Sequence, residues 1–299
     1  MTVIECSGVQ KKFKRKVGLS NITFQLEEDK IIGLIGRNGA GKTTLLQLLA
    51  GIIKPTSGVI KVFGETPFNN LFVSSNSIYI HDQMQFSRSF TLRDILETAE
   101  DFYKNWDGDL AEKLISYFNL DLQSYHSDLS KGMKNTFNFI FGLSTHCALT
   151  LLDEPINGMD EAVRKDVYRA LLKDYIAYPR TIIISSHFLE EMEHLLEEVL
   201  LIDNGTVVFN KSLEEIQSFA VALQGPTNAI QEWAVGLERL EEKQIAHGYT
   251  KVLLKAEDCT FDDRVLQQEN ITISPVSASE VYMYMTDTRS ESIDELFNR

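Results

Sequence analysis

A glycine-rich run at residues 36–44 is the part of this sequence whose residue types and spacing most clearly support chemistry. It reads Gly-Arg-Asn-Gly-Ala-Gly-Lys-Thr-Thr and fits the pattern G-x-x-x-x-G-K-[ST], known as the P-loop. The glycines allow backbone N–H groups to turn inward around an anion, and a helix N-terminus adds partial positive charge. Lys42 is expected to reach the β- and γ-phosphates of a nucleotide, and the Thr43 hydroxyl to ligate Mg²⁺. The candidate phosphate-binding residues are Gly36, Asn38, Gly39, Ala40, Gly41, Lys42, Thr43 and Thr44.

The segments on either side of this loop decide whether it binds phosphate. Residues 31–35 are an apolar run typical of a buried strand, and residues 45–50 are a run typical of a helix. Strand, glycine loop and helix in this order distinguish a P-loop from a glycine-rich turn that has no ligand.

An acidic pair supplies the second half of the candidate site. Residues 148–152 predict a buried strand that ends in Asp153 and Glu154. The carboxyl end of such a strand lies beside the P-loop in a doubly wound parallel sheet. Asp153 is then placed to hold Mg²⁺, directly or through water, and Glu154 to orient or deprotonate the attacking water. Without the P-loop, the pair would be interpreted as an acidic turn at the end of a strand.

A histidine and a helix start are further candidates. Residues 181–186 predict another buried strand, which ends at His187, so a contact of His187 with the γ-phosphate is expected. Taken alone, a histidine after a strand is usually a helix cap or a surface residue. Ser130 and Gly132 open a long helical stretch, which is either an anion site or an ordinary helix start.

Together these motifs resemble one family, the ATP-binding cassette (ABC) ATPases, over roughly residues 1–215. The matches are Walker A at 36–44, the signature at 129–133, Walker B with its catalytic glutamate at 151–155, the D-loop at 157–160 and the switch-histidine segment at 185–187. The resemblance implies that Phe13 stacks on adenine. It assigns catalysis to Lys42, Glu154 and His187, and further nucleotide contacts to Ser130, Lys131, Gly132 and Asp160.

The signature departs from the family pattern at two positions. Lys131 stands where the family usually has glycine, and Met133 stands where it usually has glutamine. Ser130 and Gly132, the two residues that approach the γ-phosphate in the family, are retained.

The segment corresponding to the Q-loop, at residues 79–83, is also irregular. Gln83 is the preferred Q-loop residue and a candidate Mg²⁺ ligand, but the spacing to Thr91 leaves Asp82 as the alternative. Either side chain offers oxygen to the metal, so the chemistry is retained in both cases.

Composition limits the classes of function. The chain of 299 residues has a formal net charge of −14. That charge argues against nucleic acid as a partner, because a phosphate backbone demands a basic surface. The three cysteines are far apart, which favours free thiols in a reducing cytoplasm. No run reaches the ~20 apolar residues of a membrane helix, so a transmembrane pathway is expected on another polypeptide.

The sequence predicts a domain boundary near residue 215. Asp203-Asn204-Gly205 separates two apolar strands and is a strong hairpin signal. Residues 216–299 are expected to form a small α/β appendage, with helices at 227–233 and 279–285. From residue 212 onward there are 16 Asp and Glu against 7 Lys and Arg. This acidic surplus is either a solvated surface or a face for a basic partner.

The resemblance implies an architecture and a set of partners. The expected fold is an α/β P-loop NTPase with a RecA-like parallel-sheet core, a small antiparallel β subdomain and a helical subdomain at about 84–147. The implied activity is Mg²⁺-dependent ATP hydrolysis in a head-to-tail pair with a second ABC ATPase subunit, in a homodimer or a heterodimer. Hydrolysis would drive a separate transmembrane permease at the cytoplasmic face of the cell membrane, contacted through residues 83–118.

Residues 277–286 give a finer resemblance. They are similar to the terminal element of ATPases that serve two-component exporters. With the signature, they favour the Ytr/Pmt and bacitracin-transporter type, and hence export of a peptide, an antibiotic or another hydrophobic compound. The alternatives are an importer ATPase and a nucleotide-gated regulatory module with little turnover.

Overall fold

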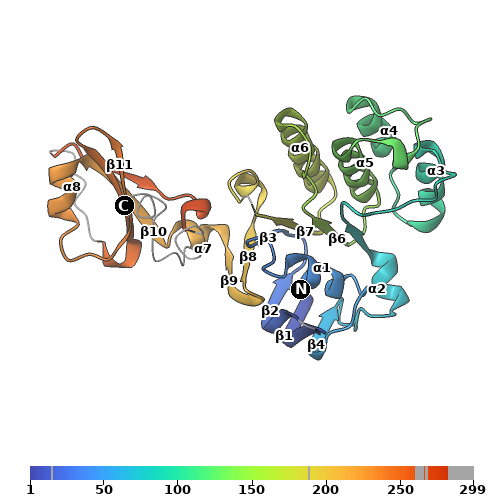
Figure 1. Ribbon diagram of the computed structural model, residues 1–299, viewed down its shortest axis with the longest axis horizontal. Helices are drawn as coiled ribbons and strands as arrows, with labels where there is room; N and C mark the ends of the chain where they lie inside the picture. The colour runs from blue at the N-terminus through green and yellow to red at the C-terminus, as the bar shows by residue number, and fades with distance from the viewer. Residues whose placement is uncertain (15, 188, 260–265, 267–268, 282–299) are drawn as a thin grey trace. The chain divides into compact units, whose positions relative to one another are not determined.

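The computed structural model describes residues 1–14, 16–187, 189–259, 266 and 269–281 (Figure 1). The chain separates into two compact units, Met1–Asn210 and Lys211–Arg299, and each is described by itself. The division therefore falls after Asn210, slightly before the position that the sequence indicates.

The first unit is built on a sheet with the strand order β5-β6-β7-β3-β8-β9. From β5 to β8 all neighbouring strands are parallel. The central strands are apolar runs whose residues are buried throughout, as expected where both faces of a parallel sheet are covered. The strands are β3 (Ile31–Ile35), β5 (Ser77–Ile80), β6 (Leu149–Asp153), β7 (Thr181–Ser186), β8 (Glu198–Asp203) and β9 (Thr206–Ser212).

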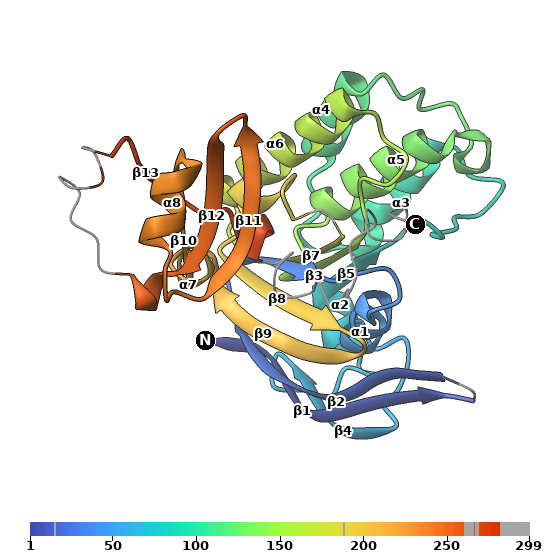
Figure 2. The same ribbon diagram turned by 60° about the vertical axis from the view of Figure 1, so that its left-hand side comes forward.

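An antiparallel sheet of order β2-β1-β4 packs against this core and lies at the bottom of Figure 2. Its strands are β1 (Thr2–Phe13), β2 (Lys16–Glu27) and β4 (Ser57–Val62). Helix α1 (Lys42–Leu49) contributes Leu45, Leu46, Leu48 and Leu49 to one apolar cluster that joins side chains from both sheets. Packing against both sheets fixes the helix that follows the P-loop, and so fixes the loop itself.

Helices α3 (Leu92–Phe102), α4 (Gly108–Tyr117) and α5 (Lys131–Ser144) form the helical part of this unit, drawn in green in Figure 1. Each begins at a side chain that caps its first turn: Thr91 in a full capping box, Asp107 and Ser130. Ser130 is thus the N-cap of α5, in agreement with the helix start expected from the sequence. The other helices of the unit are α2 (Leu71–Asn76) and α6 (Glu161–Ala177).

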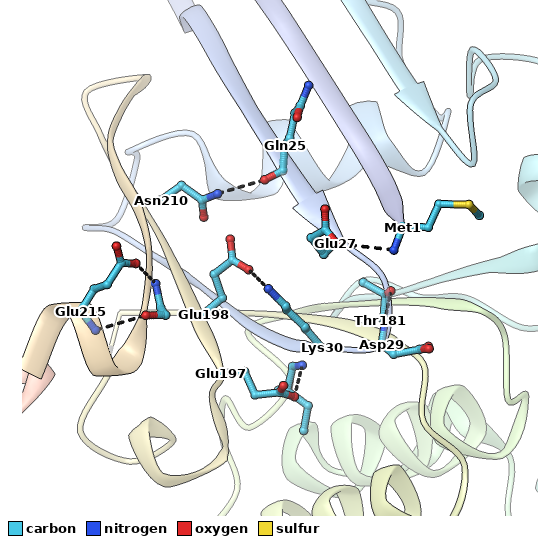
Figure 3. Close-up of polar contacts among 12 residues, drawn as sticks. Met1, Gln25, Glu27, Asp29, Lys30, Thr181, Glu197, Glu198, Asn210 and Glu215 are labelled. Atoms are coloured by element: carbon cyan, nitrogen blue, oxygen red, sulfur yellow. Dashed lines mark hydrogen bonds and ion pairs between the residues drawn. The ribbon is translucent and has the colours of Figure 1, made fainter.

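Polar contacts tie the strands together at the amino-terminal edge of the parallel sheet (Figure 3). Lys30 Nζ, just before β3, lies 3.1 Å from Glu198 Oε2 at the start of β8. The backbone N–H of Asp29 donates to Thr181 Oγ1 at the start of β7, at 3.1 Å. This edge is therefore closed by charge pairs and capping contacts, whereas the opposite edge carries the P-loop and the acidic pair.

The second unit contains an antiparallel sheet of order β11-β12-β10-β13. Helix α8 (Thr227–Trp233) packs on it through Ile230, which lies in an apolar cluster with Leu223, Val252 and Leu254. The remaining elements are α7 (Leu213–Gln217), β10 (Ala220–Pro226), β11 (Arg239–Ala246), β12 (Tyr249–Lys255) and β13 (Thr272–Pro275). The predicted helix at 279–285 extends beyond residue 281 and so lies partly outside the described residues.

Within the described part of the chain, no helix combines the length and apolar character needed to cross a membrane.

Candidate nucleotide-binding site

The P-loop joins β3 to α1 in a conformation that depends on its glycines. Gly39 has φ 86° and Gly41, the N-cap of α1, has φ 115°, both in the region that favours glycine. A Cβ on Gly41 would lie 2.6 Å from Leu19 Cδ2, and one on Gly36 would lie 2.3 Å from the carbonyl oxygen of Ile202. The loop therefore has the shape that lets its backbone N–H groups surround an anion.

The hairpin between β8 and β9 braces this loop. Gly205 N–H donates to the Ala40 carbonyl at 2.9 Å, and the Gly205 carbonyl accepts from Ser20 N–H at 2.7 Å. Asn204 and Gly205 have φ of 46° and 78°, as a tight hairpin turn requires. The Asp203–Gly205 turn, read from the sequence as a fold signal, thus also supports the candidate site.

Lys42 is buried at the first position of α1, with 6% of its side chain exposed. Its Nζ donates to the Gly36 carbonyl at 2.7 Å and lies 3.1 Å from Glu154 Oε1. A phosphate entering the loop would exchange these contacts for contacts with its own oxygens. The ammonium group is thus held inside the loop that it is expected to serve.

Glu154 lies between Lys42 and His187. Its Oε2 is 2.9 Å from His187 Nδ1, so one carboxylate contacts both predicted catalytic partners. Glu154 has φ 49°, a conformation that non-glycine residues seldom adopt and that here turns the chain directly after β6. Its backbone N–H donates to Ser185 Oγ at 2.9 Å, which holds the turn against β7.

Asp153, the last residue of β6, is 7% exposed and accepts a hydrogen bond on each carboxylate oxygen. Ser185 Oγ donates to Oδ1 at 2.7 Å, and Tyr79 OH donates to Oδ2 at 2.9 Å. Burial, together with the nearby Asp153 carboxylate, raises the pKa of Tyr79 well above its ordinary value. Tyr79 therefore stays protonated and remains a hydrogen-bond donor.

A cavity of about 240 Å³ opens in front of the P-loop. Phe13, at the end of β1, lines it with Gly18 and Lys16 from β2, and the Phe13 ring is 45% exposed. Lys11 Nζ lies 5.3 Å from the centre of that ring. The other lining residues are Arg37, Asn38, Gly39, Gly41, Lys42, Thr43, Thr44 and Glu154.

Replacing Phe13 with alanine should weaken ATP binding by about 1–2 kcal/mol, by analogy with the stacking of bases on aromatic side chains. The position favours this role because the ring borders the P-loop cavity and is only partly covered. A fluorescent ATP analogue titrated into the full chain measures the change. Phe72→Ala is the matched control, because Phe72 is also exposed and lies on α2, outside the cavity. Equal affinity in wild type and Phe13→Ala would show that Phe13 serves packing.

The signature and D-loop residues do not line this cavity. Ser130 Oγ accepts from Met133 N–H as the cap of α5, and Asp160 Oδ1 accepts from Val163 N–H as the cap of α6. A Cβ on Gly132 would lie 2.6 Å from the Gly158 carbonyl oxygen. The signature and the D-loop therefore pack on each other, and within one chain they contact each other instead of the P-loop.

The two Q-loop candidates differ in their surroundings. The Asp82 carboxylate is one of the charges that act to raise the pKa values of Tyr79 and His81. Gln83 contributes a backbone N–H that donates to His81 Nδ1 at 3.3 Å. Burial lowers the pKa of His81 despite the two nearby carboxylates, so the ring is neutral near pH 7. Gln83 therefore stays the predicted Q-loop residue, with Asp82 as the alternative.

The oxygen ligands that this site offers fit Mg²⁺ bound together with ATP. Thr43 supplies a hydroxyl and Asp153 a carboxylate, which are the hard oxygen ligands that Mg²⁺ takes beside substrate phosphates. No cluster of three or more His, Cys, Asp or Glu side chains able to hold a metal occurs among the described residues. Thr43 and Asp153 would hold Mg²⁺ together with oxygens of the nucleotide phosphates.

Sequence reasoning missed Tyr79 and the role of Ser185. Tyr79 stands in an otherwise apolar strand, where a tyrosine is ordinarily interpreted as a packing residue. Its contact with Asp153 depends on β5 lying beside β6, which no local pattern reveals. Ser185 had a usable signal, because it is a buried polar residue near the end of β7 and belongs to the switch-histidine segment.

Comparison with known proteins identifies the class to which this fold and site belong. A family described as ABC transporter matches residues 19–157. The chain is 30% identical over 218 residues to an uncharacterized ABC transporter ATP-binding protein, MJ1023, of Methanocaldococcus jannaschii, covering 71% of this chain and 79% of that protein. It is 31% identical over 218 residues to the bacitracin transport ATP-binding protein BcrA of Bacillus licheniformis, covering 72% and 70%. The chain belongs to the ABC transporter ATP-binding protein family, as the motifs predict.

A further relative and a solved structure agree with this assignment. The chain is 28% identical over 222 residues to the ABC transporter ATP-binding protein YtrB of Bacillus subtilis, covering 74% of this chain and 76% of that protein. The solved structure of an ATP-binding subunit of an ABC transporter matches with a TM-score of 0.65 at 24% identity, over 72% of this chain and 92% of the other. The predicted α/β ABC cassette fold is confirmed.

Proposed function

We propose that this chain is the ATP-hydrolysing subunit of an ABC transporter, which dimerises on ATP and drives a separate membrane permease. The observation that carries this proposal is the meeting of Lys42, Glu154 and His187 at the P-loop, with Asp153 beside them. The carboxylate of Glu154 is in contact with a lysine and a histidine at one edge of the sheet. That arrangement supplies a phosphate-binding cation and a base for the attacking water.

The proposed dimer is head to tail. Its support is that Ser130 and Gly132 lie away from the P-loop cavity of their own chain. Two chains facing each other would bring Ser130, Lys131 and Gly132 of one onto the nucleotide held by Gly39, Lys42 and Thr43 of the other. ATP would close the dimer and hydrolysis would open it, so the bound nucleotide would determine the conformation of the dimer.

We further propose that the permease contacts the helical part of the first unit. Apolar side chains stand exposed beside it: Leu71 is 86% exposed, Phe72 55% and Phe102 76%. They line a shared hollow of about 440 Å³ with Tyr103. Exposed apolar patches of this kind mark interaction sites. Phe102 falls within residues 83–118, the range expected for the membrane-facing contact.

The choice of export rests on the relatives. BcrA is named as a bacitracin transport protein. Nod factor export ATP-binding proteins of Rhizobium and Sinorhizobium are also similar to this chain. Export of a peptide, an antibiotic or another hydrophobic compound is therefore the proposal, with an importer as the second choice. Coupling is tested by examining the adjacent genes and purifying the chain together with any membrane protein that they encode. Co-purification with altered ATP hydrolysis supports the proposal, and an unchanged rate without association contradicts it.

We propose that the second unit is an accessory domain. All of the P-loop, Walker B, signature and switch residues lie in the first unit, before Asn210. A chain ending at residue 212, where β9 ends, should therefore fold and keep its ATP affinity. Thermal unfolding and titration with a fluorescent ATP analogue measure this, with the full chain as the control. A soluble, cooperatively folded truncation that fails to bind ATP would show that the second unit contributes to the site.

A further inference from the structure

We propose that Tyr79 is a positioning residue that fixes the Asp153 carboxylate for Mg²⁺. The inference rests on the proposed ATPase function and adds to it a residue to which the motifs assign no role. Tyr79 lies in β5, and its register partner in β6 is Leu151, two residues before Asp153. The tyrosine side chain is thus directed along the sheet surface to the acidic end of the neighbouring strand, where its hydroxyl donates to Asp153 Oδ2 at 2.9 Å.

The Asp153 carboxylate is held at both oxygens. Ser185 Oγ donates to Oδ1 and at the same time accepts from Glu154 N–H, so its single proton is committed to Asp153. Tyr79 holds the second oxygen. A carboxylate offers about four lone-pair positions, and two donors leave room for a metal or its water while removing the freedom of the group to rotate. Without Tyr79, Oδ2 would have no protein donor among the described residues.

Tyr79 is itself held in place. Its ring stacks on His81, with ring centres 4.7 Å apart and an angle of 25° between the planes. The His81 carbonyl accepts from Asn138 Nδ2 of α5 at 3.3 Å. The Tyr79 ring is therefore held by the Q-loop segment, which α5 holds in turn.

Groups that orient a metal ligand typically change metal affinity or activity by about 10- to 100-fold when removed. Tyr79→Phe keeps the ring and its stack on His81 but deletes the donor to Asp153. The Mg²⁺ concentration needed for half-maximal ATP binding and hydrolysis should therefore rise by about 10- to 100-fold. ATP binding in EDTA should be unchanged, because the P-loop and Phe13 are untouched.

The experiment titrates MgCl₂ into the purified full chain with a fluorescent ATP analogue, and follows hydrolysis of ATP in parallel. Tyr175→Phe is the matched control. The Tyr175 hydroxyl also donates to a carboxylate, Glu197 Oε1 at 2.6 Å, but at the amino-terminal edge of the parallel sheet, away from Asp153. An unchanged Mg²⁺ requirement in Tyr79→Phe would overturn the proposal. Equal loss of affinity with and without Mg²⁺ would also overturn it, because the hydroxyl would then serve the fold.

Asp153→Asn separates this inference from the function on which it rests. If Asp153→Asn raises the Mg²⁺ requirement and Tyr79→Phe does not, only the role of Tyr79 is refuted. If Asp153→Asn leaves the Mg²⁺ requirement unchanged, the metal site itself is misassigned and both proposals fail. A rise in both variants, with normal ATP binding in EDTA, supports both.

Discussion

Replacing Glu154 with glutamine should leave ATP bound but slow its hydrolysis by about 10²–10⁴-fold, the usual contribution of a positioned general base. The glutamine keeps the size of the side chain and its place between Lys42 and His187, but it no longer accepts a proton from water. ATP that is bound and not hydrolysed should also hold the proposed dimer closed. Phosphate release measures turnover, and gel filtration with ATP measures the dimer.

The control for this prediction is Glu161→Gln. Glu161 opens α6, pairs with Lys165 in solvent and has a 72% exposed side chain, so its loss should change neither rate nor dimerisation. If Glu154→Gln hydrolyses ATP at the wild-type rate, Glu154 is not the general base.

Replacing Lys42 with alanine should weaken ATP binding by about 1.5–3 kcal/mol or more, the range for hydrogen bonds to charged groups, and should abolish hydrolysis. The substitution removes the ammonium group that the loop positions to bind phosphate. It also removes the positive charge that faces Glu154. Lys42 also neutralises Glu154 at 3.1 Å, so its removal leaves a carboxylate of 18% exposure facing an anionic ligand.

Lys165→Ala is the control for Lys42→Ala, because Lys165 is 71% exposed on α6.

The Lys42 variant also tests the proposed head-to-tail arrangement. Ser130→Asp keeps a residue that caps α5 well while placing negative charge where a partner's phosphate would lie. Mixing Lys42→Ala with Ser130→Asp should restore hydrolysis above that of either variant alone, because one site of the mixed pair has neither defect. No recovery on mixing would contradict the shared site.

The sequence predicted the parts of the site that local pattern determines. The buried runs of β3, β6 and β7 are continuous apolar segments, and the structure places each where it was expected. Because the parallel strands end at one edge, Lys42, Asp153, Glu154 and His187 were predicted to converge. Their individual roles remain proposals that the variants above test.

What the sequence could not supply depends on contacts between distant elements. The pair of Lys42 with Glu154 and the brace from Gly205 to Ala40 join segments that are far apart in the chain. Strand β11 escaped prediction because its side chains are mostly polar and exposed, so it lacks the apolar alternation of a half-buried strand. Its place in the sheet comes from pairing with β12.

The Q-loop illustrates a third limit. Spacing alone left Gln83 and Asp82 open, because a shift of one residue in a loop changes no hydrophobic pattern. The choice between the two side chains therefore stays a prediction.

The ATPase assignment is tested most directly by phosphate release from ATP and Mg²⁺ with the purified full chain, with ATP binding followed in the same samples. We expect binding with turnover in the wild type, binding without turnover in Glu154→Gln, and weakened binding without turnover in Lys42→Ala. A wild-type chain that binds ATP but releases phosphate no faster than Glu154→Gln would contradict it, and would instead identify a nucleotide-gated module without catalysis.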